Sequence, residues 1–124
     1  MTNNILLVLT NPLPGREVEY NQWYSEVHLA EVLQRPGFVS ARRFRLGKGQ
    51  LDLDGFAQSQ HSYLALYEID GDAEVALAHV KEEMESGGLT VTEALDPNVF
   101  TAAFAATSET VLEEPTADHA TVSK

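Results

Sequence analysis

The stretch Ile5-Leu6-Leu7-Val8-Leu9 is a continuous run of apolar residues close to the start of the chain. Such a run is typical of a β-strand covered on both faces, because a half-exposed strand alternates apolar and polar residues. The turn-forming sequence Asn11-Pro12-Leu13-Pro14-Gly15 follows it. A helix is predicted next, from about residue 16 to residue 33, and it ends before the helix-breaking pair Pro36-Gly37.

Three further strands and a second helix are predicted downstream. Strand patterns cover residues 38–46, 61–69 and 99–105, and an apolar stripe at helical spacing covers residues 71–86. Residues 47–60 predict a long loop or a loose hairpin. The order βαββαβ is that of the ferredoxin-like α+β fold, in which two helices lie on one face of a four-stranded antiparallel sheet.

The other face of this sheet needs a cover as well. The first strand is apolar on both faces, whereas the two helices can cover only one of them. A second copy of the chain is the economical cover, because two such sheets then close into a barrel. We therefore expect a homodimer.

Composition indicates one domain. The chain has 124 residues, of which 44% are hydrophobic, enough for one core and too few for two. We expect the folded domain over residues 1–106 and an acidic, flexible tail over residues 107–124. The sequence contains no cysteine, which excludes disulfides, thiolate metal sites and cysteine nucleophiles.

The net charge of −11 lies entirely in the second half of the chain. Residues 1–62 hold six Lys or Arg against six acids, and residues 63–124 hold two against thirteen. Both nucleic acids and anionic membrane surfaces are bound through basic faces, so neither partner is expected. The N-terminus lacks a basic region, and its apolar run is too short for a signal peptide or a membrane span; a cytoplasmic protein is expected.

Four stretches of the sequence carry a resemblance to known proteins: Asn11-Pro12, Pro14-Gly15-Arg16-Glu17, Asn21-Gln22-Trp23-Tyr24-Ser25-Glu26-Val27-His28-Leu29 and Pro36-Gly37-Phe38-Val39-Ser40-Ala41-Arg42-Arg43-Phe44. In these stretches the chain resembles the dimeric α/β-barrel superfamily and, within it, the EthD-like proteins and related small uncharacterised domains. The resemblance is good over residues 4–46 and only topological over residues 60–106. Relatives of this kind include muconolactone-type isomerases, polyketide cyclases and haem-degrading monooxygenases, so the resemblance implies a fold more than one chemistry.

His28 is the leading candidate for a catalytic acid or base, because the pKa of imidazole lies near neutrality. In the resembled families a His at this helix position often points into the cavity between helices and sheet. Tyr24 lies one turn earlier, where it would orient His28 or donate a hydrogen bond to a substrate oxygen. The alternative is a structural His that bonds a backbone carbonyl or Glu31.

Aromatic residues supply most of the other candidates for substrate binding. Trp23 would form an apolar wall or simply join the core, and Tyr20 and Val27 are the other inward positions expected on this helix. Tyr63 and Tyr67 share one face of the strand over residues 61–69, and their phenols suit a carbonyl or phenolate oxygen. They converge on His28 if that face meets the helices, and they are interface residues if it meets a partner sheet.

Two polar residues complete the candidate binding set. In the strand over residues 38–46, alternation places Phe38, Arg42 and Phe44 on one face and Arg43 on the other. Arg43 would bind an anionic ligand in the cavity or form a structural ion pair. Asn11 would offer its amide to a developing oxyanion or cap the turn.

Metal and cofactor signals are weak. His28 and Glu31 would share a helix face, but no third ligand is evident. Asp52-Leu53-Asp54-Gly55 begins like a calcium loop, yet Tyr63 stands where the twelfth-position carboxylate should be. His79 lies on the second predicted helix, where haem-degrading relatives place an axial ligand, but it lies beside the apolar stripe and is expected to be solvated. No metal or cofactor is expected.

Three functions are consistent with these residues. The first is a cofactor-independent isomerase, cyclase or lyase that acts on a small aromatic or polyketide-like molecule, with His28 moving a proton. The second is a non-catalytic dimeric protein whose cavity only holds a ligand. The third is a haem-degrading monooxygenase, which would need His79 at the wall of an open slot.

Overall fold

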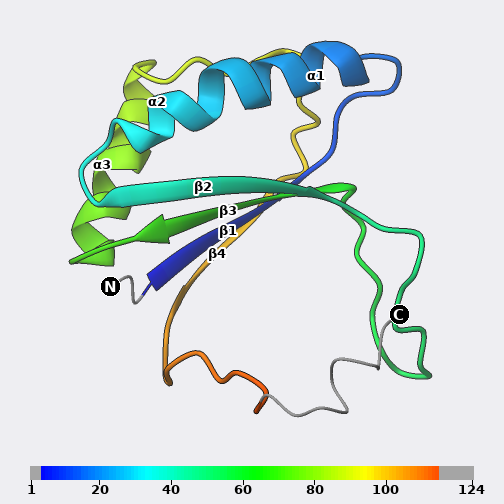
Figure 1. Ribbon diagram of the computed structural model, residues 1–124. Helices are drawn as coiled ribbons and strands as arrows, with labels where there is room; N and C mark the ends of the chain where they lie inside the picture. The colour runs from blue at the N-terminus through cyan, green and yellow to red at the C-terminus, as the bar shows by residue number, and fades with distance from the viewer. Residues whose placement is uncertain (1–3, 115–124) are drawn as a thin grey trace.

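The computed structural model describes residues 4–114 and confirms the ferredoxin-like fold (Figure 1). One antiparallel sheet has the strand order β2-β3-β1-β4. Its strands are β1 (Asn4–Thr10), β2 (Phe38–Arg45), β3 (Tyr63–Ile69) and β4 (Phe100–Ala105).

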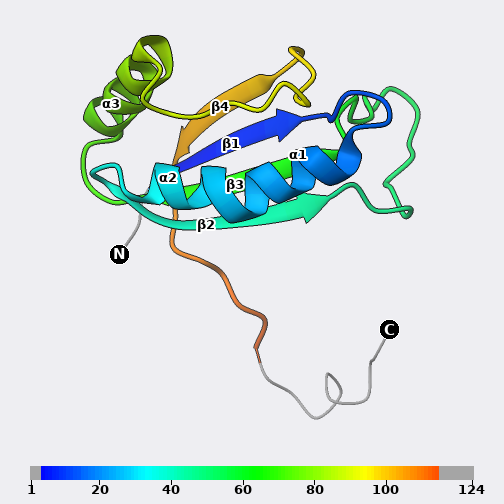
Figure 2. The same ribbon diagram turned by 90° about the horizontal axis from the view of Figure 1, so that it is seen from above.

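The helices lie on one face of the sheet (Figure 1). The first helical stretch consists of α1 (Glu17–Trp23), η1 (Tyr24–His28) and α2 (Leu29–Leu33), which follow one another without a break. The second is α3 (Ala73–Ser86). Seen from above, α1, η1 and α2 lie over β2 and β3, whereas α3 lies apart from them on the side of β4 (Figure 2).

Local sequence signals explain where α3 begins and ends. The side chain of Asp72 caps its first turn by accepting hydrogen bonds from the backbone N–H groups of Glu74 and Val75 at 2.9 and 3.3 Å. Gly87 ends it in a left-handed conformation with φ of 83°. Gly37, which directly precedes β2, has φ of 93°, and a Cβ there would lie 3.1 Å from the Cβ of Ala76 in α3. Glycine at position 37 therefore allows β2 to begin close against α3.

The core lies between the helices and the sheet, and aromatic residues dominate it. Tyr20, Tyr67 and Ile69 are its largest fully buried side chains. Tyr63, Ala65, Tyr67 and Ile69 are the buried positions of β3, so this face of the strand meets the helices. Tyr63 and Tyr67 therefore face the helices and not a partner sheet, which strand alternation alone left open.

Phe38 does not share a face with Arg42 and Phe44, contrary to the prediction from strict alternation. It pairs with Ile69 on the buried face, whereas the next paired residue, Ser40, lies opposite Glu68. Two residues of β2 thus lie opposite one residue of β3. This is a β-bulge, and it reverses which face of the sheet the following side chains of β2 occupy. Arg42 and Arg43 lie on opposite faces, as expected, since Arg43 pairs with Ala65 on the helix side.

The sheet face away from the helices is largely apolar and is uncovered within residues 4–114. The strand pairing aligns residues of all four strands on it. Phe44, Phe100 and Phe104 are exposed there. The other apolar members of this open face are Ile5, Leu7, Leu9, Leu64, Leu66 and Ala102.

Two segments without helix or strand extend beyond the open face. The loop between β2 and β3 hangs below the sheet in Figure 1 and exposes Leu51, Leu53 and Phe56, in agreement with the predicted long loop. Residues 108–114 are exposed and irregular, and the rest of the predicted tail lies outside the described residues. Among the described helices, none has the length and apolar character that crossing a bilayer requires.

Candidate functional site

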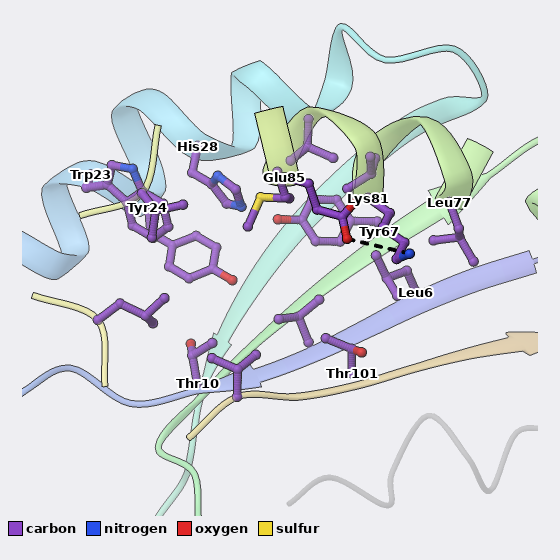
Figure 3. Close-up of a pocket in the computed structure, with 17 residues that line it drawn as sticks. Leu6, Thr10, Trp23, Tyr24, His28, Tyr67, Leu77, Lys81, Glu85 and Thr101 are labelled. Carbon is purple, nitrogen blue, oxygen red and sulfur yellow. Dashed lines mark ion pairs between the residues drawn. The ribbon is translucent and has the colours of Figure 1, made fainter. Parts of the chain in front are cut away.

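A cavity of about 530 Å³ lies between the first helical stretch, α3 and the sheet (Figure 3). Its floor consists of helix-facing residues of β1, β3 and β4, and its walls come from η1, from α3 and from the segment that leads to β4. Most of the lining is aliphatic. The uncharged polar groups among its lining residues belong to Thr10, Trp23, Tyr24, His28, Tyr67 and Thr101.

The helix that carries Tyr24 and His28 contains one turn of π-helix. The backbone N–H of Leu29 donates to the carbonyl of Tyr24, five residues earlier, instead of four. This wider turn brings His28 over Trp23, with ring centroids 4.5 Å apart and planes 23° apart. Tyr24 also meets His28 edge to face, at 5.3 Å. All three rings reach the cavity wall.

Val27 does not point inward, contrary to the prediction. Its side chain is 39% exposed. In a regular α-helix the neighbour of Trp23 on the inner face would be the residue four positions later, which is Val27. The π-helical turn shifts that place to the fifth residue, so His28 takes it.

His28 is held as a neutral imidazole. Burial lowers its pKa from 6.5 to about 4, and the charge of Glu31 opposes this only in part. Its Nδ1 atom is buried and has no hydrogen-bond partner among residues 4–114. The carboxylate of Glu31 instead accepts hydrogen bonds from the backbone N–H and the hydroxyl of Thr90, at 3.2 and 3.3 Å. The expected alternative of a His28–Glu31 hydrogen bond is therefore not what the described structure contains.

Two tyrosine hydroxyls face the same space as His28 (Figure 3). Burial raises the pKa of Tyr24 to about 12. Burial also raises the pKa of Tyr67, and the neighbouring Tyr24 adds to that shift. The Tyr67 hydroxyl is buried and without a hydrogen-bond partner within the described range. Both phenols stay protonated at neutral pH, so each can donate a hydrogen bond to a bound oxygen atom.

Trp23 both lines the cavity and holds one of its walls. Its indole N–H donates to the backbone carbonyl of Thr90 at 2.9 Å. Residues 89–96 run along the helix and carry the cavity residues Val91 and Leu95. The segment is fixed further by the Thr90–Glu31 hydrogen bonds and by that between the backbone N–H of Leu13 and the carbonyl of Ala94, at 2.7 Å. Trp23 therefore combines the two roles that the sequence left as alternatives.

Three solved structures are similar to this chain to different degrees. A proposed monooxygenase from Shewanella loihica PV-4 has a TM-score of 0.51 and 18% identity, over 88% of this chain and 99% of its own. This chain therefore shares the ferredoxin-like fold with that protein. SnoaB, a cofactor-independent oxygenase from Streptomyces nogalater, has a TM-score of 0.49 and 19% identity over 86% and 96% of the two chains. An ethyl tert-butyl ether D (EthD) family protein from Bacillus halodurans C-125 has a TM-score of 0.45 and 16% identity over 80% and 96%.

The sequence itself adds no closer relationship. No protein-family model matches it, and a search of curated proteins finds no match. At the identities of the structural neighbours the likeness concerns the fold alone, so the chemistry has to be argued from the residues of the cavity.

Arg43 and Tyr63 lie outside the cavity, in a polar cluster on its β2 side. The Arg43 guanidinium donates to the Ser25 hydroxyl at 2.9 Å and to the Asn21 side-chain oxygen at 2.8 Å. It also lies 4.6 Å from the centre of the Tyr24 ring. The Tyr63 hydroxyl donates to the carboxylate of Glu17 at 2.5 Å. Tyr63 thus supports α1 through Glu17, and Arg43 supports the Tyr24 ring.

Asn11 also lies away from the cavity. Its side-chain amide donates to the backbone carbonyl of Gln60 at 3.1 Å, and its side-chain oxygen accepts from the backbone N–H of Ser62 at 2.7 Å. It fastens the end of the long loop to the end of β1, which corresponds to the structural alternative stated for it. His79 is exposed and is not among the cavity residues. Among residues 4–114 no cluster of His, Cys, Asp or Glu is arranged to hold a metal ion.

Thr10 is a cavity residue that the sequence reasoning missed. Its hydroxyl shares a 2.5 Å hydrogen bond with the Tyr20 hydroxyl. Strand alternation contains the signal for it, because Leu6, Val8 and Thr10 share one face of β1 and all three line the cavity.

Proposed function

We propose that the cavity is the active site of an acid/base enzyme, an isomerase, cyclase or lyase, that acts on a small aromatic or polyketide-like molecule. One observation carries this proposal. His28 Nδ1 and the Tyr67 hydroxyl are buried and unpartnered among the described residues, and both residues line one cavity. Buried polar groups in folded proteins are nearly always hydrogen-bonded, so a ligand that supplies the missing partners is the economical explanation.

In the proposed reaction His28 accepts a proton from the substrate while Tyr24 donates a hydrogen bond to the oxygen atom on which negative charge develops. Tyr67 binds the same oxygen or a neighbouring one. With a pKa of about 4, His28 is a weak base in the empty cavity. A developing anion beside it raises that pKa, because an opposite charge favours the imidazolium form. His28 therefore becomes a stronger base as negative charge develops on the substrate beside it.

The same low pKa is the observation that favours a second function. A general base works best when its pKa lies near the working pH. If no substrate raises the pKa of His28, the cavity is a binding site without chemistry, and the protein is a small-ligand carrier or accessory protein.

We also propose that the protein works as a homodimer that buries the open sheet face. Its apolar residues come from all four strands and include three exposed phenylalanines. Contiguous apolar patches of this kind on a folded protein mark interaction surfaces. Covering the face with a second copy leaves the cavity accessible, because the cavity lies on the opposite side of the sheet.

Proton transfer can be tested before the substrate is known. The α-hydrogens of bicyclic aromatic ketones such as 1-tetralone exchange with D₂O when a base removes them, and NMR follows that exchange. We expect the protein to accelerate this exchange and His28→Gln to reduce the acceleration by roughly 100-fold, the usual scale for a general base. Tyr24→Phe should reduce it less, because Tyr67 still donates a hydrogen bond to the same oxygen atom.

The control is Glu26→Gln, which changes an exposed residue of the same helical turn. Binding of the ketone without accelerated exchange would favour the carrier function. Acceleration that survives in His28→Gln would contradict the role of His28.

A further inference from the structure

The distribution of charged residues around the cavity indicates which ligands the cavity binds. We infer that the cavity selects uncharged ligands, with an apolar ring body and a hydroxyl or carbonyl oxygen at one end, and rejects carboxylates. This inference rests on the proposed use of the cavity as a ligand site, but it concerns binding alone and does not require turnover.

Three hydrogen-bonding side chains of the cavity lie close together. Tyr24, His28 and Tyr67 turn their polar atoms toward a shared space (Figure 3). The Tyr67 hydroxyl, on a side chain only 1% exposed, has no partner among the described residues. A hydroxyl both donates and accepts, so phenols and ketones satisfy it equally.

The opposite part of the cavity is apolar. Leu77, Val80 and Met84 line it from α3, and Val91 and Val99 line it from the segment before β4. Such side chains bind a ring body by the burial of apolar surface and offer no hydrogen bonds. The ligand is therefore oriented, with its oxygen toward η1 and its ring toward α3.

Lys81 is the one cation among the described residues that line the cavity, and it is already paired with a carboxylate. Lys81 and Glu85 are the two lining residues with formal charges, and they form an ion pair with each other at 3.5 Å on the exposed surface of α3. Arg43 is near in space, but it contacts the back of the Tyr24 ring and donates to Asn21 and Ser25. A carboxylate in the cavity would be desolvated without a counter-charge.

The cost of that desolvation determines how strongly the cavity should prefer a neutral ligand over an anionic one. Burying an unpaired ion costs far more than burying a neutral group of the same shape. We expect 2-naphthamide to bind at least roughly 100-fold more tightly than the isosteric 2-naphthoate at pH 7. The uncharged probe 2-naphthol should bind as well, because its hydroxyl reaches Tyr67.

Isothermal titration calorimetry with these three compounds tests the inference, and two variants test its location. Tyr67→Phe should weaken 2-naphthol by roughly 10-fold, the effect of one lost hydrogen bond. Thr101→Lys places a cation on the cavity floor and should improve 2-naphthoate at least 10-fold while leaving 2-naphthamide nearly unchanged. Ala78→Lys is the matched control, because it adds the same charge to an exposed position of α3 that does not line the cavity.

Equal or tighter binding of 2-naphthoate by the unmodified protein would overturn the inference, as would the absence of binding by both uncharged probes at millimolar concentration. Equal effects of Thr101→Lys and Ala78→Lys would overturn the placement in this cavity. Failure of the proposed catalysis has a separate signature, because 2-naphthamide would then still bind selectively while ketone exchange would not accelerate.

Discussion

Trp23 and His28 stack face to face although five residues separate them, with ring centroids 4.5 Å apart. An α-helix brings residues three or four apart together. The stack exists because the turn between them is π-helical, and π-helical turns occur frequently at functional sites. Its consequence is that an imidazole replaces Val27 on the inner face of the helix.

The buried imidazole should make stability depend on pH. The pKa of His28 is about 4 in the folded protein and about 6.5 when the ring is solvated. As pH falls below 6.5 the unfolded chain binds the proton first, so stability is lost progressively down to pH 4. We expect His28 to account for a loss of about 2 kcal/mol between pH 7 and pH 5. Urea unfolding of the wild type and of His28→Gln at both pH values measures this difference, and an equal loss in the two proteins would contradict it.

Trp23→Phe should destabilise the protein and loosen residues 89–96. The substitution removes the hydrogen bond to the carbonyl of Thr90 and part of the stack on His28. A cost of about 2 kcal/mol is expected from lost packing and an unpaired carbonyl. Urea unfolding gives the cost, and hydrogen exchange should show faster exchange in the segment that Trp23 holds. Unchanged exchange there would mean that the other contacts of the segment suffice.

Arg43→Met should affect stability more than ligand binding. Arg43 donates two hydrogen bonds and contacts the rings of Tyr20, Tyr24 and Tyr63. Losing these interactions should cost about 1–3 kcal/mol. Arg45→Met, at an exposed arginine of the same strand, is the matched control and should cost less than about 1 kcal/mol, as is usual for a substitution on the surface. A loss of 2-naphthamide binding in Arg43→Met without a loss of stability would place Arg43 in the binding site.

The proposed dimer should dissociate when a charge is placed on the open sheet face. Light scattering at micromolar concentration should give twice the 13.6 kDa mass of one chain. Leu7→Glu should give the single-chain mass, because Leu7 lies at the centre of the open face between Leu66 and Ala102. The control Val18→Glu changes a side chain that is 74% exposed on α1 and should stay dimeric. A monomeric wild type would refute the proposal.

Strand alternation was reliable except at one residue. It correctly separated Arg42 from Arg43 and grouped Tyr63 with Tyr67, because side chains of a regular strand alternate strictly between two faces. It misplaced Phe38, because a bulge depends on how the neighbouring strand pairs and leaves no mark in the sequence of β2 alone.

The order of apolar runs and turn residues by itself determined the ferredoxin-like fold, since each run forms its strand or helix from local patterning and short connections admit few arrangements. It also determined that Tyr24 and His28 are neighbours on one helix. Only the tertiary structure decided that Tyr67 reaches the cavity whereas Tyr63 bonds Glu17, and that Arg43 supports Tyr24 from behind. These outcomes depend on where α1 and α3 cross the sheet, and that is set by packing between residues far apart in the sequence.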